Sequence, residues 1–225
     1  MYRVQLFSNT NPVHLEMFRS SVMRKKLGFF VFNGLWAVYF SLWIYLHLRL
    51  CHSVSGQRLA IEILLIFQNI FLLIFFVIRR LPKVTSWKPW DVTLAFLGSF
   101  ATTLFWSSQP RPPRMIGTVL QALGTLMTFY GTLSLGRSYG MLPANRRIET
   151  GGMYRFIRHP IYASYQIFAL GYLINQPSFY NVAVGVISFL SQVLRIFAEE
   201  KLLAQDPEYR KYRERVRWRM FPYLY

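Results

Sequence analysis

Long apolar runs separated by shorter polar and basic segments dominate the hydrophobic pattern of this chain. A membrane-spanning helix needs about 20 mostly apolar residues to cross a hydrocarbon layer of about 30 Å. Six segments approach this requirement: residues 27–48, 59–78, 91–106, 115–135, 161–175 and 178–197. The third is short, but tryptophans of the kind found at membrane interfaces flank it. The pattern therefore predicts an all-α, polytopic bundle of about six transmembrane helices.

The last two apolar segments are joined by the short link "NQPS", in which Pro177 acts as a helix breaker. Such a short link permits only a tight helical hairpin. The segment 161–175 is short for a full crossing, so we expect it to begin inside protein rather than in lipid. After residue 198 the chain becomes charged and ends in "EYRKYRERVRWRMFPYLY", which predicts an interfacial C-terminal helix and tail.

The charge of the chain agrees with this topology. The formal net charge is +17, although charged residues make up only 16% of the sequence. Twenty-one of the 26 lysines and arginines lie in the N-terminus, the second and fourth connections and the C-terminus, which share one side if there are six crossings. The positive-inside rule then predicts that both termini and residues 137–160 are cytosolic. Topology and anionic lipid thus explain the basic charge, and we expect no nucleic-acid partner.

The N-terminal 26 residues are polar and basic, and an uninterrupted apolar run begins only at Leu27. A secretory signal peptide has its apolar region nearer the start, followed by a small-residue cleavage site. We therefore expect this run to remain as an anchor in a bacterial inner membrane or the endoplasmic reticulum.

Several common site types are excluded by their residues. Cys51 is the single cysteine, so no internal disulfide can form, and the four histidines lack metal-binding spacing. We expect no metal site. No GxGxxG loop is present, so a soluble dinucleotide-binding fold is not supported.

The stretch "GGMYRFIRHPIYASY", residues 151–165, places polar side chains at the start of a predicted membrane helix. Pro160 suits the first helical turn, which puts His159 at the helix N-terminus and Tyr162 just inside it. The unpaired amides and positive end of a helix favour an anionic group there. The alternative is that His159 only caps the helix.

A second polar group lies at the end of the hairpin, in "LRIFAEEKLL". Arg195 and Glu199 are four residues apart and so share one helix face. Charge within a membrane segment is expensive and indicates function by default. The alternative is that Arg195 snorkels to the interface and merely pairs with Glu199. Because a hairpin brings its ends together, we expect residues 159–162 and 195–200 to be neighbours.

Four other polar residues occur within apolar runs: Glu62, Gln68, Asn69 and Gln121. Polar side chains in membrane helices often hydrogen-bond to neighbouring helices. We expect these four to hold helices together rather than to take part in function.

The ordered motifs "TGGMYRFIRHPIY", "RIFAEE", "EYRKYRERV" and "RMFPYLY" resemble the membrane methyltransferase family that includes isoprenylcysteine carboxyl methyltransferase and the phospholipid N-methyltransferases. The resemblance covers about residues 136–225, whereas the first half resembles the family only as generic membrane helices. It implies one integral domain, with N-terminal transmembrane helices over 1–135 and a cofactor-binding catalytic region over 136–225.

The resemblance implies that S-adenosylmethionine is enclosed between the C-terminal helices and the loop before them. Carried over position by position, the cofactor-binding residues are Ile148, Glu149, Tyr154, His159, Pro160, Ile161, Tyr162 and Glu199. Arg195 matches the arginine that faces the methyl acceptor. Glu149 departs from the family, which often has an apolar residue there.

The implied reaction is methylation of a lipophilic acceptor that enters from the bilayer. A carboxylate acceptor needs no general base and would be attracted by Arg195, whereas an amine or thiol must lose a proton. This difference favours an acid without establishing one. Two alternatives remain: a membrane NADPH-dependent sterol-type reductase, whose usual N-Y-x-G-E pattern is missing from "HPIYASY", and a non-catalytic lipid-binding protein.

Overall fold

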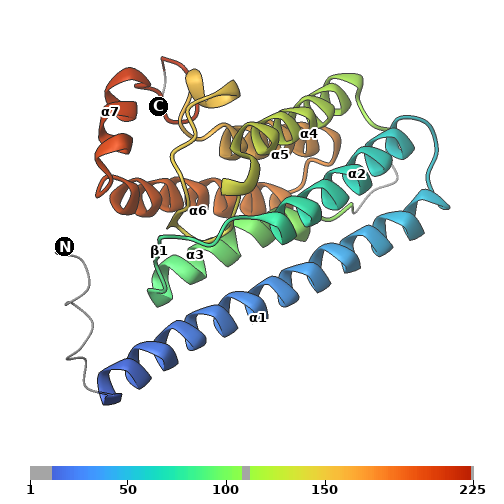
Figure 1. Ribbon diagram of the computed structural model, residues 1–225. Coiled ribbons are helices and arrows are strands. Elements are labelled where there is room, and N and C mark those ends of the chain that lie inside the picture. The colour runs from blue at the N-terminus through green and yellow to red at the C-terminus, as the bar shows by residue number, and fades with distance from the viewer. Residues whose placement is uncertain (1–11, 108–111, 224–225) are drawn as a thin grey trace.

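The computed structural model describes residues 12–107 and 112–223, except for the side chains of residues 12–27 and of Phe29. Arg3 and Arg111, which contribute to the charge asymmetry along the sequence, lie outside the described residues. Helices dominate the described chain, and they run alongside one another in an elongated bundle (Figure 1).

The main helices are α1 (Pro12–Cys51), α2 (Gly56–Ile78), α3 (Pro89–Phe100), α4 (Met115–Leu135), α5 (Pro160–Asn175), α6 (Phe179–Leu203) and α7 (Pro207–Arg215). Short 3₁₀ turns are η1 (Ala101–Leu104), η2 (Gly136–Ser138) and η3 (Gly152–Arg155). Two-residue strands β1 (Val84–Thr85) and β2 (Ala144–Asn145) pair antiparallel, with Val84 opposite Asn145 and Thr85 opposite Ala144.

Each of the six expected apolar segments forms a helix, and within the described residues four helical stretches are long and apolar enough to cross a membrane. These are Phe30–Cys51, Gly56–Ile78, Met115–Ser138 and Phe179–Leu203. The 12-residue α3 spans only about 18 Å, and the 16-residue α5 about 24 Å. The expected bundle is therefore confirmed as an integral-membrane helical fold, but α3 and α5 are too short to cross unaided. Residues 91–106 fall short because the helix tightens into η1 after Phe100.

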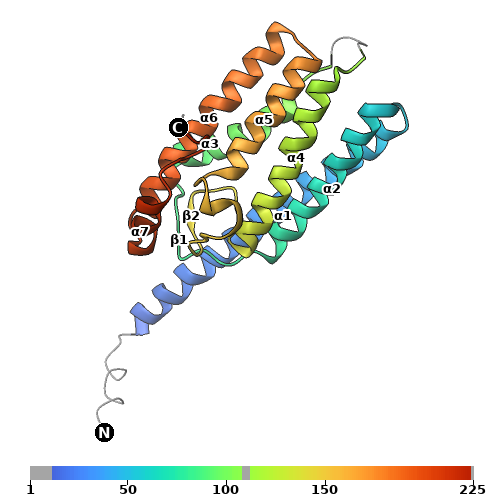
Figure 2. The ribbon, with the colours of Figure 1, turned by 90° about the horizontal axis from the view of Figure 1, so that it is seen from above.

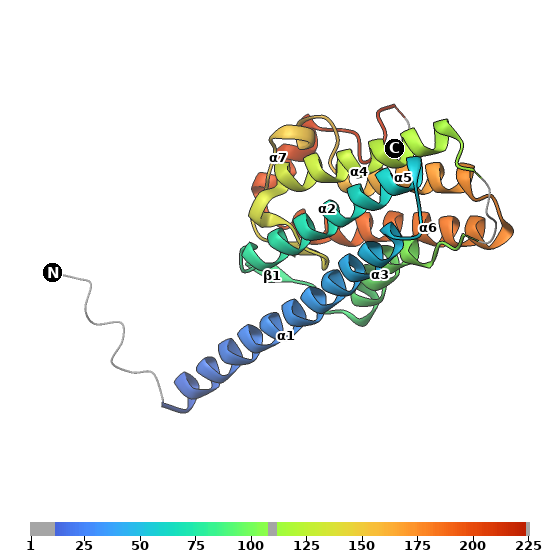
Figure 3. The same ribbon diagram turned by 90° about the vertical axis from the view of Figure 1, so that its right-hand side faces the viewer.

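Helix α1 begins earlier than the apolar pattern predicts. It has 40 residues and is about 60 Å long, roughly twice the thickness of the hydrocarbon layer. Its N-terminal end projects beyond the rest of the bundle (Figure 3). Hydrophobicity marked only the part of α1 that starts near residue 27, because the preceding turns are polar.

Helix α5 lies between α4 and α6 (Figure 2) and packs most closely on α4. Glycines make this approach possible: a Cβ on Gly124 would lie 2.7 Å from the backbone nitrogen of Phe168, and one on Gly171 would lie 2.6 Å from the carbonyl oxygen of Gly117. Small residues commonly let membrane helices approach closely. A hydrogen bond of 2.7 Å between the hydroxyls of Thr128 and Ser164 adds a polar contact.

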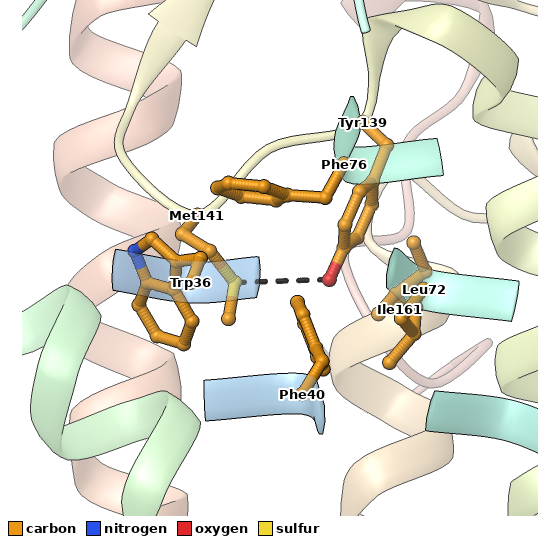
Figure 4. Close-up of a cluster of buried hydrophobic side chains, with 7 residues drawn as sticks. All are labelled: Trp36, Phe40, Leu72, Phe76, Tyr139, Met141 and Ile161. Atoms are coloured by element: carbon orange, nitrogen blue, oxygen red, sulfur yellow. Dashed lines mark hydrogen bonds between the residues drawn. The ribbon is translucent and has the colours of Figure 1, made fainter. Parts of the chain in front are cut away.

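The segment between α4 and α5, residues 136–159, folds back over the ends of the helices. Tyr139 and Met141 from this loop enter an apolar cluster with residues of α1, α2 and α5 (Figure 4). The cluster consists of Trp36, Phe40, Leu72, Phe76, Tyr139, Met141 and Ile161. It anchors the loop beside the first turn of α5, where the polar motif begins.

Candidate functional site

The two ends of the α5–α6 hairpin meet, as its tight turn predicts. The hydroxyl of Tyr162 donates to Oε2 of Glu199 over 2.8 Å. His159 Nε2 lies 3.3 Å from Oε1 of Glu200, and the guanidinium of Arg195 lies 4.9 Å from the centre of the Tyr162 ring. The two polar motifs of the sequence therefore form one cluster.

This cluster lines a cavity, called here the polar cavity, between the loop 136–159, α5, α6 and α7. Its volume is about 860 Å³, including space open to solvent. Eight of the nine expected site residues line it: Ile148, Glu149, Tyr154, His159, Ile161, Tyr162, Arg195 and Glu199. The ninth, Pro160, is buried at the first position of α5, where it shapes the helix start.

Arg195 is buried, with 3% of its surface exposed, so it does not snorkel to an interface. Its Nη2 donates to the carbonyl of Met141 over 2.8 Å, and its Nη1 contacts Oε1 of Gln192 at 3.3 Å and the hydroxyl of Ser99 at 3.4 Å. Among the described residues it forms no ion pair with Glu199, so the pairing alternative is wrong. These bonds hold the guanidinium against the cavity wall.

Glu200 organises the start of α5 from behind. Its carboxylate contacts Arg158 Nε at 3.2 Å, His159 Nε2 at 3.3 Å and Arg219 Nε at 3.1 Å. The backbone amide of His159 also donates to the carbonyl of Arg219 over 2.8 Å. The His159 ring stacks on the Tyr162 ring, with centroids 5.5 Å apart and planes 6° apart. His159 is thus held in place by the C-terminal segment while it lines the polar cavity.

Tyr154 and Ile148 belong to an apolar wall completed by α7. Both pack in a cluster with Tyr209 and Tyr212, and the Tyr212 hydroxyl donates to the carbonyl of Tyr154 over 2.7 Å. Burial raises the pKa of Tyr154 well above its usual value. Its hydroxyl therefore stays protonated at neutral pH and can donate a hydrogen bond.

Glu149 lines the polar cavity, but one of its carboxylate oxygens already accepts hydrogen bonds from other residues of the chain. Its Oε1 accepts from the hydroxyl of Ser138 at 3.0 Å and from Nη1 of Arg80 at 3.2 Å. Glu149 therefore ties the loop to the end of α2, and this explains how an acidic residue fits where the family often has an apolar one.

Arg146 is a cavity residue that the sequence did not reveal. Only 8% of its surface is exposed, and its guanidinium donates no hydrogen bond and forms no ion pair among the described residues. Burial lowers the pKa of Arg146 to about 10, although nearby Glu199 opposes the shift, so it is cationic at neutral pH. Arg147 beside it is largely exposed. No sequence signal separates the two, since neighbouring loop arginines look alike until the loop folds.

Tyr209 and Tyr212 are also cavity residues that were not singled out. They lie three residues apart on α7 and so share one face. The motif "EYRKYRERV" contains this spacing, which was the available signal. Among the described residues, no group of three or more His, Cys, Asp or Glu is arranged to hold a metal ion.

A second cavity, called here the intramembrane cavity, lies between α1, α2, α3, α4 and α5. Its volume is about 1200 Å³, including open space. Both cavities are lined by Ser99, Tyr139, Met141 and Tyr165. Arg195 hydrogen-bonds to two of these four, Ser99 and Met141. The guanidinium of Arg195 therefore lies at the wall between the polar cavity and the intramembrane cavity.

The fold and site define an integral-membrane helical protein with a charged, aromatic cavity beside a cavity inside the bundle. Residues 113–209 match the family model of phospholipid methyltransferases. This match agrees with the resemblance that the motifs carry, and it covers less than half of the chain.

The fold itself is similar to a solved structure of the eukaryotic intramembrane Ras methyltransferase, isoprenylcysteine carboxyl methyltransferase. The TM-score is 0.50 and the identity 19%, over 96% of this chain and 88% of that chain. No curated protein matches the sequence.

Proposed function

We propose that this chain is a membrane methyltransferase that uses S-adenosylmethionine to methylate the carboxylate of a lipophilic acceptor, which enters from the bilayer. The observation that carries the proposal is the position of Arg195 at the wall shared by the two cavities. The polar cavity suits a water-soluble methyl donor, and the intramembrane cavity suits a lipophilic acceptor. The guanidinium of Arg195, which is bonded to the wall between them, attracts an anion.

The polar cavity suits the donor molecule. S-adenosylmethionine carries a carboxylate, an ammonium and an aromatic base, and its sulfonium supplies an electrophilic methyl group. Arg146, buried without a partner among the described residues, and His159 at the start of α5 are placed to bind the carboxylate, together with the amides of Ile161 and Tyr162. Glu199 is placed to bind the ammonium, and Tyr154 to flank the adenosyl group, with Ile148 and Glu149 as further wall contacts.

Arg195 is placed to orient the acceptor carboxylate. Its guanidinium is already fixed by Met141, Gln192 and Ser99, so little freedom is lost when an acceptor binds. Holding two reactants in a productive geometry supplies much of the acceleration of a displacement reaction. A carboxylate needs no base, and its charge is neutralised as the bond forms, so burial away from water favours the step.

The concentration of lysine and arginine in the loop 136–159 and after α6 supports a cytosolic polar cavity. Cytosolic S-adenosylmethionine would then reach the polar cavity from the water side, and the acceptor would reach the intramembrane cavity from lipid.

Titration of the purified protein with S-adenosylmethionine and with NADPH tests the proposal. We expect saturable binding of S-adenosylmethionine alone, followed by transfer of labelled methyl from it to a lipid-soluble product in membranes. Binding of NADPH alone would instead support a sterol-type reductase. Binding of neither would support a non-catalytic lipid-binding protein.

A further inference from the structure

The intramembrane cavity is unexpectedly polar at the end far from Arg195. There His47 Nδ1 lies 2.5 Å from Oε2 of Glu62, joining α1 to α2. Both residues line the cavity, together with Gln68, Asn69 and Thr102. On α2, Glu62 is ten residues before Leu72, which packs beside the loop residues Tyr139 and Met141, so this polar end lies about 15 Å along the helix from the shared wall.

The polar side chains on α2 do not serve mainly to join helices. Asn69 donates to the carbonyl of Leu65 in its own helix over 2.8 Å. Gln68 makes no hydrogen bond within the described part of the chain. Of these three residues, Glu62 alone bonds to another described helix, and it does so through Oε2. The expectation that the polar residues of α2 hold helices together is therefore met by Glu62 alone.

Unused hydrogen-bonding capacity faces the cavity at this end. Oε1 of Glu62 receives no donor from the described residues, and the amide of Gln68, which lies on α2 between Glu62 and Leu72, also makes no hydrogen bond with them. Polar groups withdrawn from water cost free energy unless they are paired. Ionisable residues within membrane segments mark sites of function by default. A purely hydrocarbon ligand would leave these groups unpaired, whereas a hydroxyl or ammonium would satisfy them.

We infer that the intramembrane cavity binds the body of the acceptor and that Glu62 and Gln68 recognise a hydrogen-bond donor, a hydroxyl or an ammonium, at the end remote from the methylated carboxylate. The inference rests on the proposed function. It describes an acceptor with two polar ends: an anionic one at Arg195 and a donor at Glu62, separated by an apolar stretch along Phe40, Leu72 and Phe168.

Binding of matched amphiphiles tests this inference. Dodecanoate and its ω-hydroxy and ω-amino derivatives share the carboxylate and chain length and differ only at the far end. With the full chain in lipid nanodiscs, we expect the two derivatives to bind about tenfold more tightly than dodecanoate, because a hydrogen bond to a charged group contributes this order of affinity. Equal affinity for the three compounds would overturn the inference.

Substitutions test whether Glu62 and Gln68 cause the preference for the two derivatives. Glu62→Gln and Gln68→Leu should each reduce the preference for the derivatives while leaving dodecanoate affinity unchanged. Gln68→Leu removes no hydrogen bond to the described chain, so it remains informative if Glu62→Gln folds poorly because its hydrogen bond to His47 is weakened. Glu208→Gln, on the exposed face of α7, is the control and should retain the full preference. A preference that survives both cavity variants contradicts the assignment.

Methyl transfer measured in parallel separates the two claims. The protein could prefer the two derivatives but methylate none of the compounds and bind no S-adenosylmethionine. That result would contradict the proposed function and support the distal binding site. Methylation with the same KM for all three compounds would support the proposed function and contradict the distal site.

Discussion

At the scale of single residues, adjacent identical side chains have different tasks. Glu199 faces the polar cavity and accepts from Tyr162, whereas Glu200 faces the protein and contacts Arg158, His159 and Arg219. Consecutive helical residues point in different directions because a turn contains 3.6 residues. One glutamate is therefore available for a ligand, and its neighbour holds the chain around that ligand.

Substitutions of Glu199 and Arg195 should separate binding from turnover. Glu199→Ala removes the carboxylate proposed to hold the ammonium, so affinity for S-adenosylmethionine should fall at least tenfold. Arg195→Ala should leave that affinity nearly unchanged and abolish turnover, because the arginine is proposed to touch only the acceptor. Calorimetric titration and single-turnover methyl transfer measure the two effects. Turnover retained in both variants would refute these roles.

Asp206 links the loop to α7. Its carboxylate accepts from Asn145 Nδ2 over 2.8 Å and, as N-cap, from the amide of Glu208 over 2.9 Å. Asp206→Ala should destabilise α7 by about 1 kcal/mol. Hydrogen exchange of residues 207–215 should accelerate, whereas Asp206→Asn should lie between wild type and Asp206→Ala, because its single oxygen can keep the cap bond to Glu208 but its amide nitrogen cannot accept from Asn145.

The same aspartate should make the docking of α7 sensitive to acid. The hydrogen bonds from Asn145 and Glu208 lower the pKa of Asp206 below its usual value. The folded state therefore favours the ionised form, and its stabilisation is full above the usual pKa and lost as pH falls through the lowered one. Exchange of α7 should rise over that acidic window in wild type but not in Asp206→Asn. Equal acid sensitivity of the two proteins would contradict this role.

At the scale of elements, the seam between α4 and α5 sets the position of the site. Glycines bring the two backbones close together, and α5 carries His159, Ile161 and Tyr162 at its start. The seam was not evident from apolar periodicity, because glycine and threonine contribute little to hydrophobicity. Its importance follows from the distances between backbones, which only the folded chain supplies.

Gly124→Ala tests the seam. The added Cβ would lie 2.7 Å from Phe168 nitrogen and 2.8 Å from Ser164 oxygen, and backbone atoms cannot move aside readily. Overpacking of this kind costs about 1–3 kcal/mol, so the thermal unfolding midpoint should fall. Gly34→Ala on α1 is the matched control, because its added Cβ would meet no other described segment within 4 Å and the midpoint should not fall. Similar midpoints for both variants would show that α4 and α5 can separate.

At the scale of the whole molecule, the last described segment returns to the beginning of the site. The amides of Arg158 and His159 donate to the carbonyls of Trp218 and Arg219 over 2.9 and 2.8 Å. Met220 is 1% exposed and packs with Ile157, Ala163 and Ile196. The C-terminal segment is therefore part of the scaffold that positions His159.

Met220→Ala should weaken both stability and ligand binding. Truncation of a buried methionine costs about 2–5 kcal/mol, and loosening of the segment frees the backbone of His159. We expect a lower unfolding midpoint and reduced affinity for S-adenosylmethionine. Tyr223→Ala, at a side chain 90% exposed, is the control and should leave both unchanged. Loss of stability with full affinity would show that the segment does not position the site.

Sequence reasoning predicted the helical membrane fold, the hairpin and the meeting of the two polar motifs, because hydrophobic runs and a four-residue link leave few alternatives. It missed Arg146, whose burial depends on the folded loop. It also missed the early start of α1, since polar helical turns carry no hydrophobic signal. The second cavity was not predictable either, because it is formed by five helices that lie far apart in the sequence.

The placement of Arg195 at the wall between the chambers bears on how a turnover cycle ends. In the proposed reaction, esterification removes the negative charge of the acceptor carboxylate, through which the guanidinium of Arg195 binds it. The product is an uncharged ester, which Arg195 no longer attracts. It therefore partitions back into lipid more readily than the acid. Release would thus be driven by the reaction itself, with no moving gate required.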